Sequence, residues 1–336
     1  MIRLRLSAED LSRIRFAFSP LWETVTSLRT LTGRHELHRP WVRQVSPVLR
    51  NSPVDLALLT ALVRPAGYIP DFLVPSPDRR DPTFAAELAR VGAADLDAVA
   101  TQLRHLADHP VAQAGPGREA RVRVIEELAA DPDRGLARVL AELDAYWQVA
   151  VAPYWPRITG LLQADLAYRL EEMAAGGVQR LFEALHPRVS FERDEVRVVK
   201  YWDGTADLGG RGLLLVPCAF AWPDVIVLTA EPGTPTLSYS PRGLGRLWET
   251  AASQPQPGLS EVLGRTRASL LAQLDLPMST TQLASLLELS APTLNAHLKA
   301  LQGAGMLTSR RDGRAVLYAR TDLSESLLAA GGRTRP

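Results

Sequence analysis

Apolar residues recur at three- and four-residue spacing through the first half of the chain, with Pro, Gly and Asp between the repeats. This spacing is typical of helices that bury one face. One such helix is predicted to begin after Asp131. Another runs through Leu170 to a stop at Gly176 and Gly177, because glycine readily takes the backbone conformation that ends a helix. The pattern predicts a helical N-terminal domain at residues 1–187.

The pattern changes to short apolar or β-branched runs after residue 187. Glycines and a Pro-Asp pair separate these runs, as turns separate the strands of an antiparallel meander. We therefore expect a small antiparallel sheet within residues 188–250, packed on the helical domain. The runs are Val196–Trp202, Leu213–Pro217, Val225–Leu228 and Thr236–Tyr239. The Pro- and Gln-rich residues 251–258 cannot continue a helix and are predicted to form a linker.

Residues 259–330 have the clearest helical periodicity and are predicted to form a separate domain. A second helix follows Ser279, and a turn at residues 288–290 leads into a third helix over residues 291–302. Two helices joined by a turn of this length form a helix-turn-helix. The first helix of the domain is predicted from the apolar residues Val262, Leu263, Leu270, Leu271 and Leu274.

The third helix of this domain has two different faces. Each residue advances 100° around a helix, so apolar residues at i, i+4 and i+7 form one buried stripe. These are Leu294, Leu298 and Leu301. The opposite face, with its flanks, consists of Pro292, Thr293, Asn295, Ala296 and Lys299. Such a face has the composition to enter a major groove, where Pro292 or Ala296 would contact thymine methyl groups.

A predicted hairpin follows the third helix. Asp312-Gly313 is a strong two-residue turn signal between two alternating strands. Three arginines, Arg310, Arg311 and Arg314, cluster at its tip. A cationic hairpin beside a recognition helix can reach phosphates or the adjacent minor groove, so the order of the elements favours a DNA-binding wing over a merely solvated surface.

The region from Leu259 to Thr321 resembles the ArsR-type winged helix-turn-helix family. The residues that carry the resemblance are Leu263-Gly264-Arg265-Thr266-Arg267, Leu283-Ala284, Leu289-Ser290, Thr293, His297-Leu298-Lys299, Leu301, Ala304-Gly305 and the arginine-rich hairpin. The resemblance implies a dimeric repressor that binds imperfect palindromes in double-stranded DNA and releases them when an inducer binds. The predicted DNA contacts are Thr280, Ser290, Pro292, Thr293, Asn295, Ala296, His297, Lys299, Arg310, Arg311 and Arg314.

The chain departs from this family at the positions of its metal ligands. Metal sensors of the family carry cysteines in the helix before the recognition helix, or Asp and His ligands on a later helix. Residues 278–283 contain no cysteine and residues 322–328 contain no histidine. The one cysteine, Cys218, lies elsewhere and cannot form a thiolate site alone. We therefore predict no metal ion and no other cofactor.

The start of the recognition helix also differs. A polar residue often begins this helix in the family, whereas this chain has Ala291. Base discrimination is then expected of Asn295, which can form two hydrogen bonds with adenine, and of Thr293. His297 either packs beside the leucine stripe or donates to a phosphate, and both interpretations stay open.

Residues 6–23 are similar to the start of an uncharacterised domain found ahead of such winged helices in high-GC bacteria. That resemblance leaves dimerisation, inducer binding and catalysis as possible roles. The sequence has no G-x-S-x-G elbow, P-loop or dinucleotide-binding fingerprint. His35 and His38 are not spaced as a zinc-binding pair on a helix. We therefore predict that the protein is not an enzyme.

Aromatic residues lie near the predicted junction between the helices and the sheet. Aromatic side chains beside a sheet can line an apolar ligand pocket, although ordinary core packing would use the same residues. The candidates for ligand binding are Trp147, Tyr154, Trp155, Trp202 and Trp222.

The net charge of +1 is unevenly distributed. From Leu259 onward there are nine basic and six acidic residues, which gives +3 there and −2 in the rest of the chain. The positive bias falls where nucleic acid would bind. No run of eighteen uncharged apolar residues is present and the N-terminus does not resemble a signal peptide, so we expect a cytoplasmic protein without membrane association.

Together these patterns predict an α+β, mostly α fold, with a helical N-terminal domain, a small antiparallel sheet and a C-terminal winged helix-turn-helix. The predicted function is a homodimeric one-component transcription regulator, a repressor released by a small-molecule inducer. Two alternatives stay open. One is a protein-interaction module without DNA binding, and the other is a ligand-binding or enzymatic N-terminal domain with a degenerate winged helix.

Overall fold

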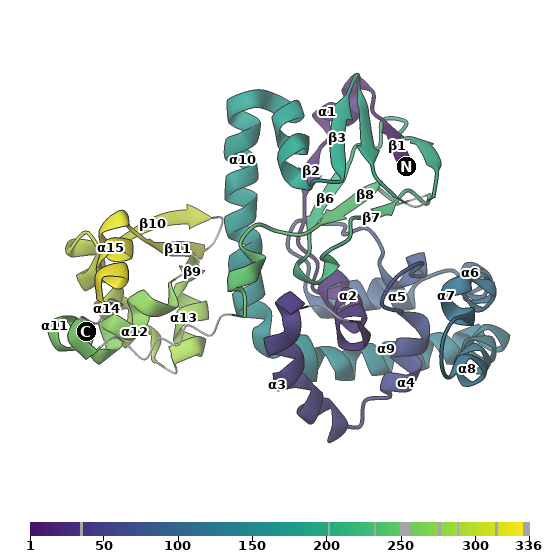
Figure 1. Cartoon of the computed structure of the whole chain (residues 1–336), viewed down its shortest axis with the longest axis horizontal. Coiled ribbons are helices and arrows are strands. Elements are labelled where there is room, and N and C mark those ends of the chain that lie inside the picture. The colour runs from purple at the N-terminus through teal and green to yellow at the C-terminus, as the bar shows by residue number, and fades with distance from the viewer. Residues whose placement is uncertain are drawn as a thin grey trace. The chain divides into compact units, whose positions relative to one another are not determined.

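The computed structural model describes residues 1–33, 36–200, 202–231, 233–248, 257–274, 277–287, 289–312 and 315–331. The chain divides into two compact units (Figure 1). The first contains Met1–Trp155 and Asp165–Leu244, and the second contains Pro156–Ala164 and Gly245–Pro336. The predicted fold class, α+β and mostly helical, is confirmed. None of the described helices is both long and apolar enough to span a membrane.

Several helices of the first unit begin after a residue whose side chain caps them. The side chains of Ser19, Asp55, Thr83, Asp95 and Asp131 each accept a hydrogen bond from a backbone N–H of the first turn that follows. The main helices are α2 (Pro20–Thr32), α3 (Arg39–Arg50), α4 (Leu56–Leu62), α5 (Phe84–Gly92), α6 (Leu96–Asp108), α7 (Pro110–Gln113), α8 (Arg118–Ala130), α9 (Pro132–Tyr146) and α10 (Trp155–Leu185). Residues Pro156–Ala164 of α10 belong to the second unit. In Figure 1, α2 and α4 to α9 lie together at one end of this unit.

The predicted helix stop in α10 is confirmed. Gly176 (φ −147°) and Gly177 (φ 67°) leave the helical conformation, so the helix breaks there and a second segment runs on to Leu185. The positive φ of Gly177 is a conformation that glycine adopts at little cost. Helical structure therefore reaches almost to the predicted boundary at residue 187.

The first unit contains two four-stranded mixed sheets, which corrects the prediction of one antiparallel sheet. One has the order β3 (Val189–Glu192), β4 (Glu195–Val198), β1 (Ile2–Arg5), β5 (Gly204–Asp207), and the other has the order β2 (Arg15–Phe16), β6 (Leu214–Pro217), β8 (Thr236–Tyr239), β7 (Ile226–Leu228). The pairs β1–β5, β2–β6 and β6–β8 are parallel, and the other pairs are antiparallel.

The mixed topology has a physical cause in the N-terminal residues. Strand β1 alternates buried and exposed positions, and it enters the sheet between β4 and β5. Ile2 and Leu4 thereby join the core formed by Val196, Leu215 and Leu237. The sequence prediction paired only strands that follow one another in the chain, so it missed these long-range partners.

A helix of the second unit begins where the end of the linker was predicted. Residues 251–256 of the predicted linker lie outside the described residues, and α11 (Pro257–Leu263) includes its last two residues. Gly264, with φ 80°, separates α11 from α12 (Arg265–Gln273), so the single first helix predicted from residues 262–274 is wrong. Val262 is 80% exposed instead of buried.

The helix-turn-helix and the hairpin of the second unit follow in the predicted order, and the structure adds strand β9 (Met278–Ser279) and helix α15 (Asp322–Gly331). The other elements of this part are α13 (Thr280–Leu287), α14 (Ala291–Gly303), β10 (Leu307–Asp312) and β11 (Ala315–Arg320). Strand β11 lies between β10 and β9, and both pairings are antiparallel. Leucines from α12, α13, α14 and β10 form the core, together with Met278. The unit is therefore a helix-turn-helix followed by a hairpin.

Candidate functional site

Helix α14 is fixed in the second unit by its cap and its leucine stripe. Ser290 is the N-cap, and its Oγ accepts a hydrogen bond from the N–H of Thr293 at 3.4 Å. Leu294, Leu298 and Leu301 are at most 1% exposed. This burial confirms the predicted periodicity and determines which side of the helix faces away from the core.

The opposite face of α14 is exposed to solvent. Its residues are Pro292, Thr293, Asn295, Ala296 and Lys299, and all five are exposed as the rotation of 100° per residue predicts. Helix α14 contains no acidic residue, so Lys299 gives this face a positive charge. His297 is half-buried, so both interpretations of its role, packing beside the leucine stripe and donating to a phosphate, stay open. A polar, acid-free helix face of this kind is suited to a DNA groove.

The hairpin is attached to the end of α14. Gln302 donates from Nε2 to Ser309 Oγ at 2.8 Å, and the N–H of Met306 donates to the carbonyl of Leu301 at 2.9 Å. Arg310 and Arg311 in β10 are both exposed. Because they are consecutive in a strand, their side chains point to opposite faces. A partner that lies against one face of the hairpin therefore contacts one of these two arginines more closely than the other.

The remaining predicted DNA contacts have different positions. Thr280 is the first residue of α13 and is half-buried, whereas Ser290 is exposed and also acts as the cap of α14. Arg314 and the turn residue Gly313 lie outside the described residues. The backbone register nevertheless pairs Asp312 with Ala315, so β10 and β11 are consecutive strands of one hairpin. The assignment of individual DNA contacts stays a prediction.

The five aromatic residues predicted to bind a ligand do not meet in one place. Trp147 is buried and stacks on Phe84, with ring centroids 4.6 Å apart. Trp155 lies edge-on to Trp147 at 5.7 Å, and the Tyr154 hydroxyl donates to Gln44 Oε1 at 3.1 Å. These three side chains therefore belong to the packing of the helices.

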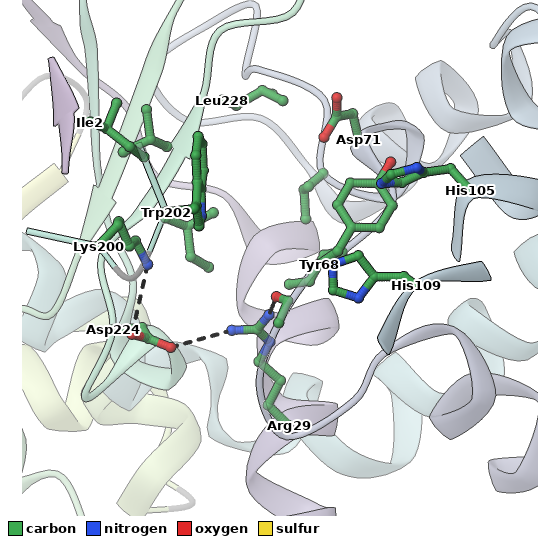
Figure 2. Close-up of a pocket in the computed structure, with 15 residues that line it drawn as sticks. Ile2, Arg29, Tyr68, Asp71, His105, His109, Lys200, Trp202, Asp224 and Leu228 are labelled. Atoms are coloured by element: carbon green, nitrogen blue, oxygen red, sulfur yellow. Dashed lines mark hydrogen bonds and ion pairs between the residues drawn. The ribbon is translucent and has the colours of Figure 1, made fainter. Parts of the chain in front are cut away.

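The two remaining aromatic candidates lie in separate cavities. Trp222 lies near His186, with ring centroids 6.3 Å apart, beside one open depression of the first unit. Trp202 lines a different cavity of about 360 Å³, which Figure 2 shows in close-up. That cavity is bounded by Ile2, Arg29, Gly67, Tyr68, Ile69, Asp71, Val74, His105, His109, Lys200, Trp202, Asp224, Ile226, Val227 and Leu228. Of the predicted ligand-binding residues, Trp202 alone lines this cavity.

Charged side chains converge on Asp224 at one end of the cavity. Arg188 Nη1 lies 3.0 Å from Asp224 Oδ1, Lys200 Nζ lies 3.7 Å from the same oxygen, and Arg29 Nη1 lies 3.6 Å from Oδ2. The Arg29 and Lys200 side chains are 9% and 13% exposed. Burial lowers the pKa of Lys200, and the nearby Asp224 carboxylate opposes that shift.

The opposite wall of the cavity is lined by aromatic and titratable side chains. Tyr68 lies edge-on to His105 at 4.9 Å and 5.9 Å from His109, measured between ring centroids (Figure 2). Burial raises the pKa of Tyr68 and of Asp71, and it lowers the pKa of His109. His109 Nδ1 accepts from the N–H of Val111 at 3.2 Å, so its Nε2 is the nitrogen left for other partners. Among the described residues no group of three or more His, Cys, Asp or Glu side chains is arranged to hold a metal ion.

Sequence reasoning missed the charged end of this cavity. Its residues come from α2, from the segment after β4 and from the loop before β7, so no local spacing connects them. One weak signal was present in the composition. The chain has only two lysines, and one lies on the exposed face of α14 while the other, Lys200, lies in this cavity.

The helix-turn-helix, its exposed polar face and the arginines of the hairpin define a DNA-binding domain of the kind found in transcription regulators. Residues 263–310 match the model of a helix-turn-helix domain, in agreement with this geometry. Residues 1–243 match a family of unknown function, DUF5937, and the chain belongs to that family. The curated proteins and the solved structures gave no significant match. The predicted helix-turn-helix and the uncharacterised N-terminal domain are thus confirmed.

Proposed function

We propose that this protein is a one-component transcription regulator whose second unit is an ArsR-type winged helix that binds double-stranded DNA. The observation that carries the proposal is the two-faced geometry of α14. Its leucines are buried, while Pro292, Thr293, Asn295, Ala296 and Lys299 are exposed together. A helix of this length and polarity is the element that helix-turn-helix proteins insert into the major groove.

Each part of the proposed interface has a distinct task. Asn295 pairs with adenine through its amide, and Thr293 contacts a neighbouring base edge. Pro292 and Ala296 pack on thymine methyl groups. The hairpin β10–β11 is the wing, which holds the DNA backbone through its arginines and fixes the register of α14. Backbone contacts supply affinity and base contacts supply specificity.

We further propose that the protein is a cytoplasmic homodimer that represses its target and is released by a small-molecule inducer. The dimer and the repression follow from the resemblance to the ArsR type. The inducer is supported by the cavity of about 360 Å³ in the first unit, whose walls combine buried charges with aromatic side chains. The proposed role is regulatory and not enzymatic.

The test is a binding titration of the full chain with an operator selected from random DNA. Fluorescence anisotropy at several salt concentrations gives the slope of log affinity against log salt. Lys299→Met is expected to weaken binding to all sequences and to reduce the slope by about 0.9 if Lys299 contacts one phosphate. Asn295→Ala is expected to cost about 5- to 150-fold at one base position and to leave the slope unchanged.

Arg265→Met is the matched control, because Arg265 is an exposed cation on α12 in the same unit. It is expected to change the affinity much less than Lys299→Met. If selection yields no preferred sequence, and neither α14 variant changes the affinity more than this control, the second unit is a protein-interaction module and the proposal is wrong.

A further inference from the structure

The cavity of about 360 Å³ in the first unit has a charged end and an apolar body. In Figure 2, Arg29 rises from α2 towards Asp224, and Lys200 approaches the same carboxylate from the other side. Trp202 and Tyr68 stand on opposite walls above this group. The volume falls within the range of about 300–1,000 Å³ that is usual for small-molecule sites.

The charged end carries more positive than negative charge. Arg29, Arg188 and Lys200 all lie within 3.7 Å of the Asp224 carboxylate, so these four side chains have a net charge of +2, while Asp71 lies on the opposite wall of the cavity. One cation would be enough to pair the carboxylate. Lys200 is largely out of solvent and lies beside two guanidinium groups as well as this carboxylate, which costs free energy that a bound anion would recover.

Two glycines hold the key side chains in place. The carbonyl of Gly67 accepts a hydrogen bond from Arg29 Nη2, and the φ of 91° at Gly67 is one that other residues rarely adopt. A Cβ at Gly204 would lie 2.8 Å from the ring of Trp202, so the absence of a side chain there allows the indole to lie close against β5. The backbone at these two glycines therefore accommodates the observed positions of Arg29 and Trp202.

The body of the cavity is suited to a flat apolar group. Ile2, Ile226 and Leu228 contribute aliphatic surface on the sheet side, and Tyr68 and Trp202 contribute aromatic faces. Trp202 remains 47% exposed. An indole that lines a cavity and is still half open to solvent gains burial when a ligand enters.

We propose that this cavity binds a small organic acid with a planar, apolar body, whose carboxylate lies against Lys200 and Arg29 and whose ring lies between Trp202 and Tyr68. The role of this ligand as the inducer rests on the proposed function. Its binding to the cavity does not depend on that function. Binding to the cavity is measured without DNA, so a failure of DNA binding and a failure of ligand binding are separate results.

Isothermal titration calorimetry of the full chain tests the proposal with 2-naphthoate and benzoate as probes. The neutral isostere 2-naphthamide controls for the charge of the ligand. Because a hydrogen-bonded charge in a buried site contributes more than a neutral partner, 2-naphthoate is expected to bind about tenfold or more tightly than 2-naphthamide. Benzoate is expected to bind more weakly than 2-naphthoate, since it buries less apolar surface.

Two variants locate the site. Lys200→Met keeps an unbranched side chain that is one atom shorter and has no charge, and it leaves Arg29 and Arg188 on Asp224. It is expected to weaken 2-naphthoate binding about tenfold or more while leaving 2-naphthamide unchanged. Trp202→Leu is expected to weaken both ligands. Arg5→Met is the matched control, because Arg5 is an exposed cation on β1 that does not line the cavity.

Circular dichroism of each variant establishes that it is folded. Carboxylate-selective binding that is lost in Lys200→Met and retained in Arg5→Met supports the proposal. The proposal is overturned if neither acid binds at millimolar concentration, if the amide binds as tightly as the acid, or if folded Lys200→Met and Trp202→Leu bind like the unmodified protein.

Discussion

Glu23 is a fully buried carboxyl group that connects α2 to the segment after β6. Its Oε1 accepts from the N–H of Ala219 at 2.6 Å, and its Oε2 accepts from the N–H of Phe220 at 3.0 Å and from Cys218 Sγ at 3.2 Å. Burial raises the pKa of Glu23 to about 7, and the backbone hydrogen bonds oppose this rise. The variant Glu23→Gln tests the effect of this buried carboxyl group, because it keeps the shape of the side chain and removes the ionisable group.

The effect on stability depends on pH in a defined direction. Between its ordinary pKa of 4.5 and about 7, Glu23 is protonated in the folded protein and ionised in the unfolded chain. A raised carboxyl pKa therefore stabilises the fold fully below pH 4.5, and that contribution is lost as the pH rises through 7. A shift of this size makes the contribution about 2–3 kcal/mol larger at pH 5 than at pH 8.

The glutamine variant has a cost of its own. Its amide NH₂ would face one of the backbone donors that Glu23 now satisfies, which costs about 1–3 kcal/mol. Denaturant unfolding followed by tryptophan fluorescence reports on this region, because six of the seven tryptophans precede residue 245. The free-energy difference between the unmodified protein and Glu23→Gln is expected to be about 2–3 kcal/mol greater at pH 5 than at pH 8.

The exposed glutamate Glu126 on α8 supplies the control Glu126→Gln. It removes the same charge without removing a buried carboxyl group. A free-energy difference for Glu23→Gln that is equal at the two pH values, or larger at pH 8, would refute the reasoning about burial.

One further variant in each unit tests the packing of that unit. Asp165 pairs with Arg169 at 3.0 Å in the interior and accepts from the Tyr239 hydroxyl at 2.8 Å, so Asp165→Ala should cost about 3–5 kcal/mol in denaturant unfolding by leaving a buried cation uncompensated. A cost below 1 kcal/mol would contradict this. Leu298→Ala should destabilise the second unit by about 2–5 kcal/mol in calorimetry, whereas Lys299→Ala on the exposed face should stay within about 0.5 kcal/mol. Equal effects of the two would mean that the burial of α14 is misassigned.

The sequence predicted those elements whose information is local. Helix α14 has its cap at Ser290 and its buried stripe at Leu294, Leu298 and Leu301, all within a dozen residues. The break at Gly176 and Gly177 likewise depends on the residues themselves. Periodicity and capping therefore gave α14 and its exposed face without knowledge of the tertiary structure.

The parts that depend on distant partners were not predictable in this way. Strand β1 pairs with β4 and β5, about two hundred residues away, and nothing in residues 2–5 specifies that pairing. The charged end of the cavity joins Arg29, Lys200 and Asp224 for the same reason. The break at Gly264 was missed because apolar residues continue on both sides of it, although its φ of 80° interrupts the helix.

The central claim is that the exposed face of α14 contacts DNA bases. A photo-crosslinking benzophenone amino acid placed at position 296, on that face, tests this directly with a labelled operator obtained by selection. The same amino acid at position 265, on α12, is the control. We predict a crosslink to the operator from position 296 and none from position 265. Crosslinking from position 265 with none from position 296 would contradict the claim.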